Sequence, residues 1–121
     1  MTPADSLQQP RRILRLTRAR PALGRCRAIE RLVGAGTRIP VAELAATSRR
    51  SAPVALARQT AMYLARVVHG LSFRDIALAF GRDPRTVAHA CRRIEERRED
   101  PAFDAFLARL ERATVVAGGQ P

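Results

Sequence analysis

Apolar residues in this chain recur at steps of three and four positions, and no stretch alternates apolar and polar side chains as a half-buried strand does. Glycines and prolines interrupt the pattern at short intervals. Aromatic residues make up only 4% of the 121 residues and Trp is absent, so the core has to come from Leu, Ile, Val and Ala. Ala and Leu are strong helix formers. The sequence therefore predicts an all-α fold of short helices.

Six segments show this helical spacing, and the one that follows Ser72 is described below. The first carries Leu23, Cys26, Ile29, Leu32 and Val33 on one face and ends at Gly34 and Gly36. A short helix is predicted around Val41, Leu44 and Ala45. Pro53 opens a longer helix, because the missing N–H of proline is harmless in a first turn. Gly70 ends this helix. The last two starts are Asp83-Pro84 and Asp100-Pro101, in which an N-cap residue precedes proline.

The block from Ser72 to Arg98 is the most informative. Ser72 is a suitable N-cap for a short helix that ends at Gly81, and the next helix begins directly after Asp83. Two helices joined by a tight glycine-containing turn form the helix-turn-helix unit, whose second helix enters the major groove of DNA. With Val87 at the centre of the buried face, the opposite face carries Arg85, His89, Arg92 and Arg93. An ordinary amphipathic surface helix also has a charged outer face, so this pattern needs support from elsewhere in the chain.

The charge distribution gives that support. The formal net charge is +11; residues 1–93 hold 18 Arg against 5 acidic residues, and residues 94–121 hold 4 Arg against 6. A strongly basic part up to residue 93, followed by a mildly acidic part, indicates that a polyanion binds to one side of the protein. Every basic residue is Arg, as a GC-rich genome favours. Residues 1–20 show no apolar period and are interpreted as a flexible basic arm. The acid-free stretch 11–27 is also similar in composition to an organelle transit peptide.

Several other classes of protein are disfavoured. Cys26 and Cys91 stand far apart, and neither Cys91 nor His69 or His89 has partners at metal-ligand spacing. No apolar run approaches the length of a membrane span, about 20 residues. No nucleophile and base are arranged for catalysis, and Glu95 and Glu96 are expected to pair with nearby arginines. We predict a cytoplasmic, nucleoid-associated protein that is not an enzyme and uses no cofactor, metal or membrane.

Three runs of sequence carry a more specific signal. They are RQTAMYLA at residues 58–65, IALAFGRD at residues 76–83 and TVAHACRRIE at residues 86–95. In order and spacing they resemble the C-terminal helix-turn-helix DNA-binding domain of the bacterial replication initiator DnaA. The resemblance extends from Leu23 to Leu110. It implies a bacterial double-stranded DNA-binding domain.

The resemblance also implies DNA-contacting residues. In the family an Arg of the basic connector enters the minor groove, and Arg50 matches it, with Arg49 and Ser51 beside it. The Arg of the Arg-Gln pair contacts the major groove, as Arg58 would with Gln59 next to it. At the recognition helix, the resemblance implies base contacts for Asp83 and Thr86, and contact of Ala90 with a thymine methyl group. His89 and Arg93 complete the expected surface on its outer face.

The chain departs from the family pattern at two places. Pro84-Arg85 replaces the usual His-Thr pair, and the turn has a single glycine, Gly81. Arg85 is able either to bind guanine through O6 and N7 or to hold a phosphate, which carries no sequence information. The phosphate loop of the initiator's nucleotide-binding module requires Lys, and this chain has none, so no nucleotide binding is predicted.

These observations predict a flexible basic arm at residues 1–20, a DnaA-like domain at residues 21–117 and a flexible tail at residues 118–121. The predicted function is sequence-preferring binding of double-stranded DNA in the regulation of replication initiation or transcription. The replication initiator or its regulators are further candidate partners. The alternative is a protein-interaction module that keeps the initiator fold and modulates replication proteins without reading DNA, because the family's main reading residues are the ones that changed.

Overall fold

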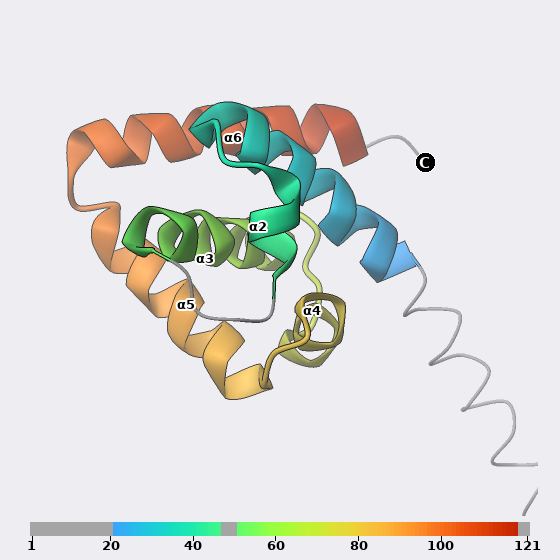
Figure 1. Cartoon of the computed structure of the whole chain (residues 1–121). Helices are drawn as coiled ribbons and strands as arrows, with labels where there is room; N and C mark the ends of the chain where they lie inside the picture. The colour runs from blue at the N-terminus through green and yellow to red at the C-terminus, as the bar shows by residue number, and fades with distance from the viewer. Residues whose placement is uncertain (1–20, 47–50, 119–121) are drawn as a thin grey trace, which may run out of the picture.

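The computed structural model describes residues 21–46 and 51–118. Within them every regular element is helical, which confirms the all-α prediction. Residues 21–37 form the first helix described, and after it come α2 (Val41–Ala45), α3 (Ala52–Val67), α4 (Phe73–Phe80), α5 (Pro84–Arg97) and α6 (Pro101–Gly118) (Figure 1). The predicted arm at residues 1–20 lies outside the described residues. Helix α6 includes Gly118, and residues 119–121 of the predicted tail also lie outside the described residues.

Helix α3 is the centre of the domain. It packs against α2, α4, α5 and α6, and Figure 1 shows these helices arranged around it. Its side chains are buried along most of its length, and three of them, Ala57, Ala61 and Ala65, are small enough to let neighbouring helices approach closely. Ile76 of α4, Ile94 of α5 and Leu107 of α6 complete a core of aliphatic side chains. Close packing of this kind makes the position of each outer helix depend on α3.

The first helix differs from the sequence prediction at both ends. Cys26, Ile29 and Val33 are buried as expected, whereas Leu23 is 45% exposed beside the exposed Leu78 of α4. The helix does not end at Gly34; it continues to residue 37. Gly34 is needed there for close approach, because a Cβ at this position would lie 2.9 Å from the carbonyl oxygen of Ile39. The chain reverses at residue 38, so that the Ile39 amide donates to the Gly34 carbonyl at 3.2 Å.

Arg27 pairs with Glu30 inside the first helix and also links that helix to α4. Glu30 is fully buried and accepts a hydrogen bond from Arg27, and Arg27 also donates to the carbonyl oxygen of Ala79 near the end of α4. The guanidinium carbon of Arg27 lies 5.9 Å from the centre of the Phe80 ring. A buried carboxylate is costly unless it is paired, so Arg27 is required where Glu30 is present. The pair fixes the end of α4 against the first helix.

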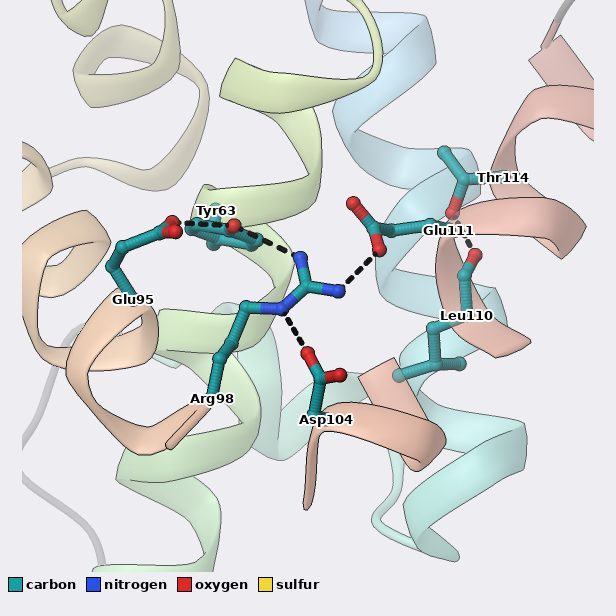
Figure 2. Close-up of polar contacts among 7 residues, drawn as sticks. All are labelled: Tyr63, Glu95, Arg98, Asp104, Leu110, Glu111 and Thr114. Atoms are coloured by element: carbon teal, nitrogen blue, oxygen red, sulfur yellow. Dashed lines mark hydrogen bonds and ion pairs between the residues drawn. The ribbon is translucent and has the colours of Figure 1, made fainter. Parts of the chain in front are cut away.

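A polar cluster at the start of α6 joins three helices (Figure 2). Arg98 donates to Asp104 at 2.5 Å, to Glu111 at 2.9 Å and to the Tyr63 hydroxyl at 3.1 Å. These hydrogen bonds raise the pKa of Arg98 above its ordinary value, so the guanidinium stays charged. The Tyr63 hydroxyl donates to Glu95 at 2.6 Å. The expected pairing of Glu95 with an arginine is therefore wrong: its partner is a tyrosine of α3.

None of the described helices combines the length and the hydropathy that a membrane crossing requires.

The Arg98 cluster gives a prediction about stability. Replacing Arg98 with Met removes three hydrogen bonds from a site where the side chain is 22% exposed and leaves two carboxylates without their cation. We expect the free energy of unfolding to fall by about 2–3 kcal/mol in urea denaturation. Arg112→Met, on the exposed side of α6, is the control and should change it by less than about 0.5 kcal/mol. Equal losses in the two variants would contradict the role of the cluster.

Cys26 gives a prediction about pH. Burial raises the pKa of its thiol from the ordinary 9.0 to about 11. The thiol therefore ionises at a lower pH in the unfolded chain than in the folded chain. The stability that the buried, neutral thiol contributes is complete below pH 9 and is lost as the pH rises through 11. Urea midpoints measured over this range should fall more steeply for the native chain than for Cys26→Ala. Cys91→Ala is the matched control, because Cys91 is only partly buried and its slope should change less. Parallel slopes for the native chain and Cys26→Ala would contradict this assignment.

Candidate nucleic-acid interface

Local capping interactions set the geometry between α4 and α5. Ser72 accepts a hydrogen bond from the Asp75 amide at 3.0 Å and begins α4, and Gly81 ends it in the left-handed conformation with φ 62°. Asp83 then accepts from the Arg85 amide at 2.7 Å, and Pro84 follows as the first residue of α5. These are the capping residues that the sequence predicts. The two helices therefore form a helix-turn-helix unit with a turn of three residues, Gly81 to Asp83.

Helix α5 has one buried face and one exposed face. Val87, Ala90 and Ile94 are at most 1% exposed and hold the helix against the core. The opposite face is exposed and presents Arg85, Thr86, His89, Arg92 and Arg93. A recognition helix needs this arrangement, because its donors must reach the base edges while its apolar side anchors it to the domain. We call these five exposed side chains the α5 outer face.

Charge is distributed unevenly along α5. Arg85, Arg92 and Arg93 stand in the part up to residue 93, and Glu95 and Glu96 follow them. The ion pairs of the described residues join Arg27 to Glu30 and Arg98 to Asp104 and Glu111, so the three outer-face arginines take no part in them. Their charges point to solvent. Arg97 follows these two glutamates, so the last turn of α5 is of mixed charge. The part up to residue 93 is basic on its exposed face and suits a polyanion.

Comparison with known proteins identifies the family. Residues 26–94 match the family of the bacterial DnaA protein helix-turn-helix. The chain belongs to this family. The chromosomal replication initiator protein DnaA of Acinetobacter baumannii is 47% identical over 86 residues, and that of Acinetobacter baylyi is 45% identical over 86 residues. Each alignment covers 69% of this chain and 18% of the initiator, so the chain spans less than a fifth of the length of these curated relatives.

A solved structure supports the same assignment. The crystal structure of a DNA replication initiation factor superposes with a TM-score of 0.74 at 26% identity, over 92% of this chain and 36% of the other. The chain therefore contains a DnaA helix-turn-helix domain, as the three sequence runs indicate.

Arg58 is mostly buried in this structure. It is only 7% exposed, and its Nε and Nη2 atoms donate to the carbonyl oxygens of Leu44 and Glu43, both at 2.9 Å. The major-groove contact that the resemblance implies for it stays a prediction. In this DnaA helix-turn-helix domain Arg58 binds the end of α2. A partner 14 residues away in the sequence determines this, so the local RQ motif gives no sign of it.

Ala90 also points inward. It is 1% exposed and packs in the core with Val87 and Ile94. Its contact with a thymine methyl group stays a prediction. Gln59 is partly buried on α3, and Ser51 is exposed at the start of that helix. Arg49 and Arg50 lie outside the described residues.

The remaining predicted residues share one surface. Arg85, Thr86, His89 and Arg93 lie together on the α5 outer face, and Asp83 is exposed at its start. Asp83 uses one carboxylate oxygen to cap α5. The second oxygen is the atom that suits an exposed base donor such as cytosine N4. The DnaA helix-turn-helix domain thus concentrates its candidate DNA contacts on the first turns of α5.

Arg82 was not predicted as a functional residue. It stands in the turn between α4 and α5, is partly buried and donates from Nη2 to the carbonyl oxygen of Ala46 at 3.1 Å. Its position directly after Gly81 in the turn is the only sign that the sequence offers. Among the described residues, no group of three His, Cys, Asp or Glu side chains is placed to hold a metal ion.

Proposed function

We propose that this protein binds double-stranded DNA with a preference for particular sequences and regulates replication initiation or transcription in the bacterial cytoplasm. The observation that carries the proposal is the α5 outer face, which stands on a helix-turn-helix unit of the DnaA family. The curated relatives are chromosomal replication initiators, and this chain spans 18% of their length. The proposal therefore concerns DNA recognition and does not extend to the other activities of an initiator.

Electrostatics supports binding to a polyanion. The net charge of +11 attracts the phosphate backbone from a distance, and the outer-face arginines offer several donors at short range. Glu95, whose carboxylate binds Tyr63, and Glu96 follow this basic surface toward the end of α5. The charge pattern favours an approach in which the N-terminal part of α5 meets the DNA. Helix-turn-helix proteins place the same part of the recognition helix against base edges.

Arg85 is the residue on which sequence preference depends most. It is the second residue of α5, its amide is held by Asp83, and its side chain is exposed. A guanidinium group at this place reaches guanine O6 and N7 with two donors, which is the commonest specific contact of arginine. His89 and Arg93 follow one and two turns later on the same face. We propose that Arg85 reads a base and that Arg93 holds a phosphate.

Salt dependence tests the DNA-binding proposal. If the protein neutralises about six phosphates, the logarithm of the binding constant should fall against the logarithm of salt concentration with a slope near −5. Fluorescence anisotropy with a short labelled duplex measures this slope. A slope near zero would show that counterion release does not drive binding and would contradict the proposal.

Single substitutions test how sequence is read. Arg85→Ala should cost about 1–3 kcal/mol on the duplex that the protein prefers and much less on a scrambled duplex. Arg93→Ala should weaken binding to both duplexes alike and reduce the salt slope by about one unit. Arg112→Ala on α6 is the charge-matched control and should leave the preference between duplexes unchanged.

Two outcomes would replace parts of the proposal. Equal losses on both duplexes for Arg85→Ala would show that Arg85 holds a phosphate and reads no base. If neither Arg85→Ala nor Arg93→Ala changes DNA binding, and one of them abolishes capture of a replication protein, the protein-interaction function takes the place of DNA reading.

A further inference from the structure

One hydroxyl group joins the central helix α3 to the end of the recognition helix. Tyr63 of α3 is 4% exposed, and its hydroxyl donates to a carboxylate oxygen of Glu95 on α5 at 2.6 Å. The same hydroxyl oxygen accepts from Nη1 of Arg98 at 3.1 Å (Figure 2). Because Arg98 occupies the acceptor side of the hydroxyl, the single proton of Tyr63 is directed to Glu95. The Glu95 side chain is therefore held against α3.

Without this hydrogen bond Glu95 would have a different partner. Residues three and four positions apart are neighbours on a helix surface, and opposite charges at this spacing attract each other. Arg92 stands three positions before Glu95 and is exposed. Arg98 stands three positions after it, but its guanidinium already binds Asp104 and Glu111. These two carboxylates would repel a third, so Arg92 is the partner that remains.

The charge of Arg92 is available to DNA as long as Glu95 is held elsewhere. Arg92 belongs to the α5 outer face and takes part in none of the ion pairs among the residues that the structure describes. A carboxylate paired with it would offset its charge and would bring a negative group toward the phosphates. The direction of the Glu95 side chain thus controls how basic the outer face is.

We propose that Tyr63 is a positioning residue for DNA binding: its hydroxyl keeps Glu95 on α3 and leaves Arg92 free to hold a phosphate. This inference rests on the proposed DNA-binding function. Tyr63 itself is buried and acts only through Glu95. The hydroxyl keeps its proton at neutral pH, because burial and the hydrogen bond to Glu95 raise the pKa of Tyr63 above its ordinary value.

The hydrogen bond can be tested without DNA. Tyr63 is the only tyrosine of the chain and Trp is absent, so near-ultraviolet absorbance reports the ionisation of this one side chain. Glu95→Gln should lower the pKa of Tyr63, because the charge of Glu95 and its hydrogen bond both raise it. Glu96→Gln removes the same charge one residue later and should leave this pKa unchanged. Identical titration curves for the native chain and Glu95→Gln would overturn the proposal.

A double-mutant cycle tests the consequence for DNA. Tyr63→Phe removes only the hydroxyl oxygen, and in fluorescence anisotropy it should weaken binding to the preferred and the scrambled duplex alike, about two- to threefold at low salt. The loss should disappear at high salt, where attraction between exposed charges is screened. When Glu95 is already Gln, Tyr63→Phe should have no effect, since no carboxylate is left to pair with Arg92. In a Glu96→Gln background, the matched control, it should still cause the full loss.

The outcomes separate the positioning role from the proposed function. Circular dichroism first confirms that each variant is folded. A loss in Tyr63→Phe that persists at high salt, or that Glu95→Gln does not remove, would show that Tyr63 acts through the stability of the fold and would overturn the positioning role. Unchanged binding by Tyr63→Phe would overturn it as well. If the native chain binds no duplex at either salt concentration, the proposed function fails and the positioning role fails with it, whereas the absorbance titration still shows whether the hydrogen bond exists.

Discussion

The burial of α3 is the constraint on which the other elements depend. Helices α2, α4, α5 and α6 pack against it, and its alanines at 57, 61 and 65 leave room for their backbones to come close. This domain has few aromatic residues, so it has few large side chains that could fill a gap between helices. The helices must therefore be closely and accurately spaced. The recognition helix is therefore held by Val87, Ala90 and Ile94 from beneath and by the turn at its start.

Arginine serves two separate purposes in this chain. Arg27, Arg58, Arg82 and Arg98 bind backbone carbonyls, carboxylates or the Tyr63 hydroxyl inside the domain, whereas Arg85, Arg92 and Arg93 project from α5. The planar fork of a guanidinium group is suited to both purposes, and Lys is not equivalent to it. A substitution of arginine can thus change DNA binding through structure or through contact. Stability and exchange measurements distinguish the two.

The sequence predicts the local features of the site well and its tertiary features poorly. The caps at Ser72 and Asp83 and the stop at Gly81 depend on interactions within a few residues, and each is found as predicted. Arg58 and Ala90 were assigned by family position, and their burial depends on partners in other helices. Glycine often ends a helix, so the sequence predicts an end at Gly34, whereas in the structure Gly34 makes room for the Ile39 carbonyl. The spacing places Leu23 on the apolar face of the first helix, but this part of the helix lies beyond the core and the side chain is exposed.

The uneven charge of this chain has a consequence for the rate of association. Residues up to 93 hold a large excess of arginine, whereas residues 94–121 hold 4 Arg against 6 acidic residues, so the chain has a basic end and an acidic end. The electric field of a duplex rotates the protein before the two make contact, because the acidic end is repelled and the basic end is attracted. Encounters with the acidic end forward are shortened, and a larger share of collisions begins with the first turns of α5 facing the groove. Orientation is thus partly decided within a Debye length of the DNA, about 10 Å at moderate salt, before any hydrogen bond forms.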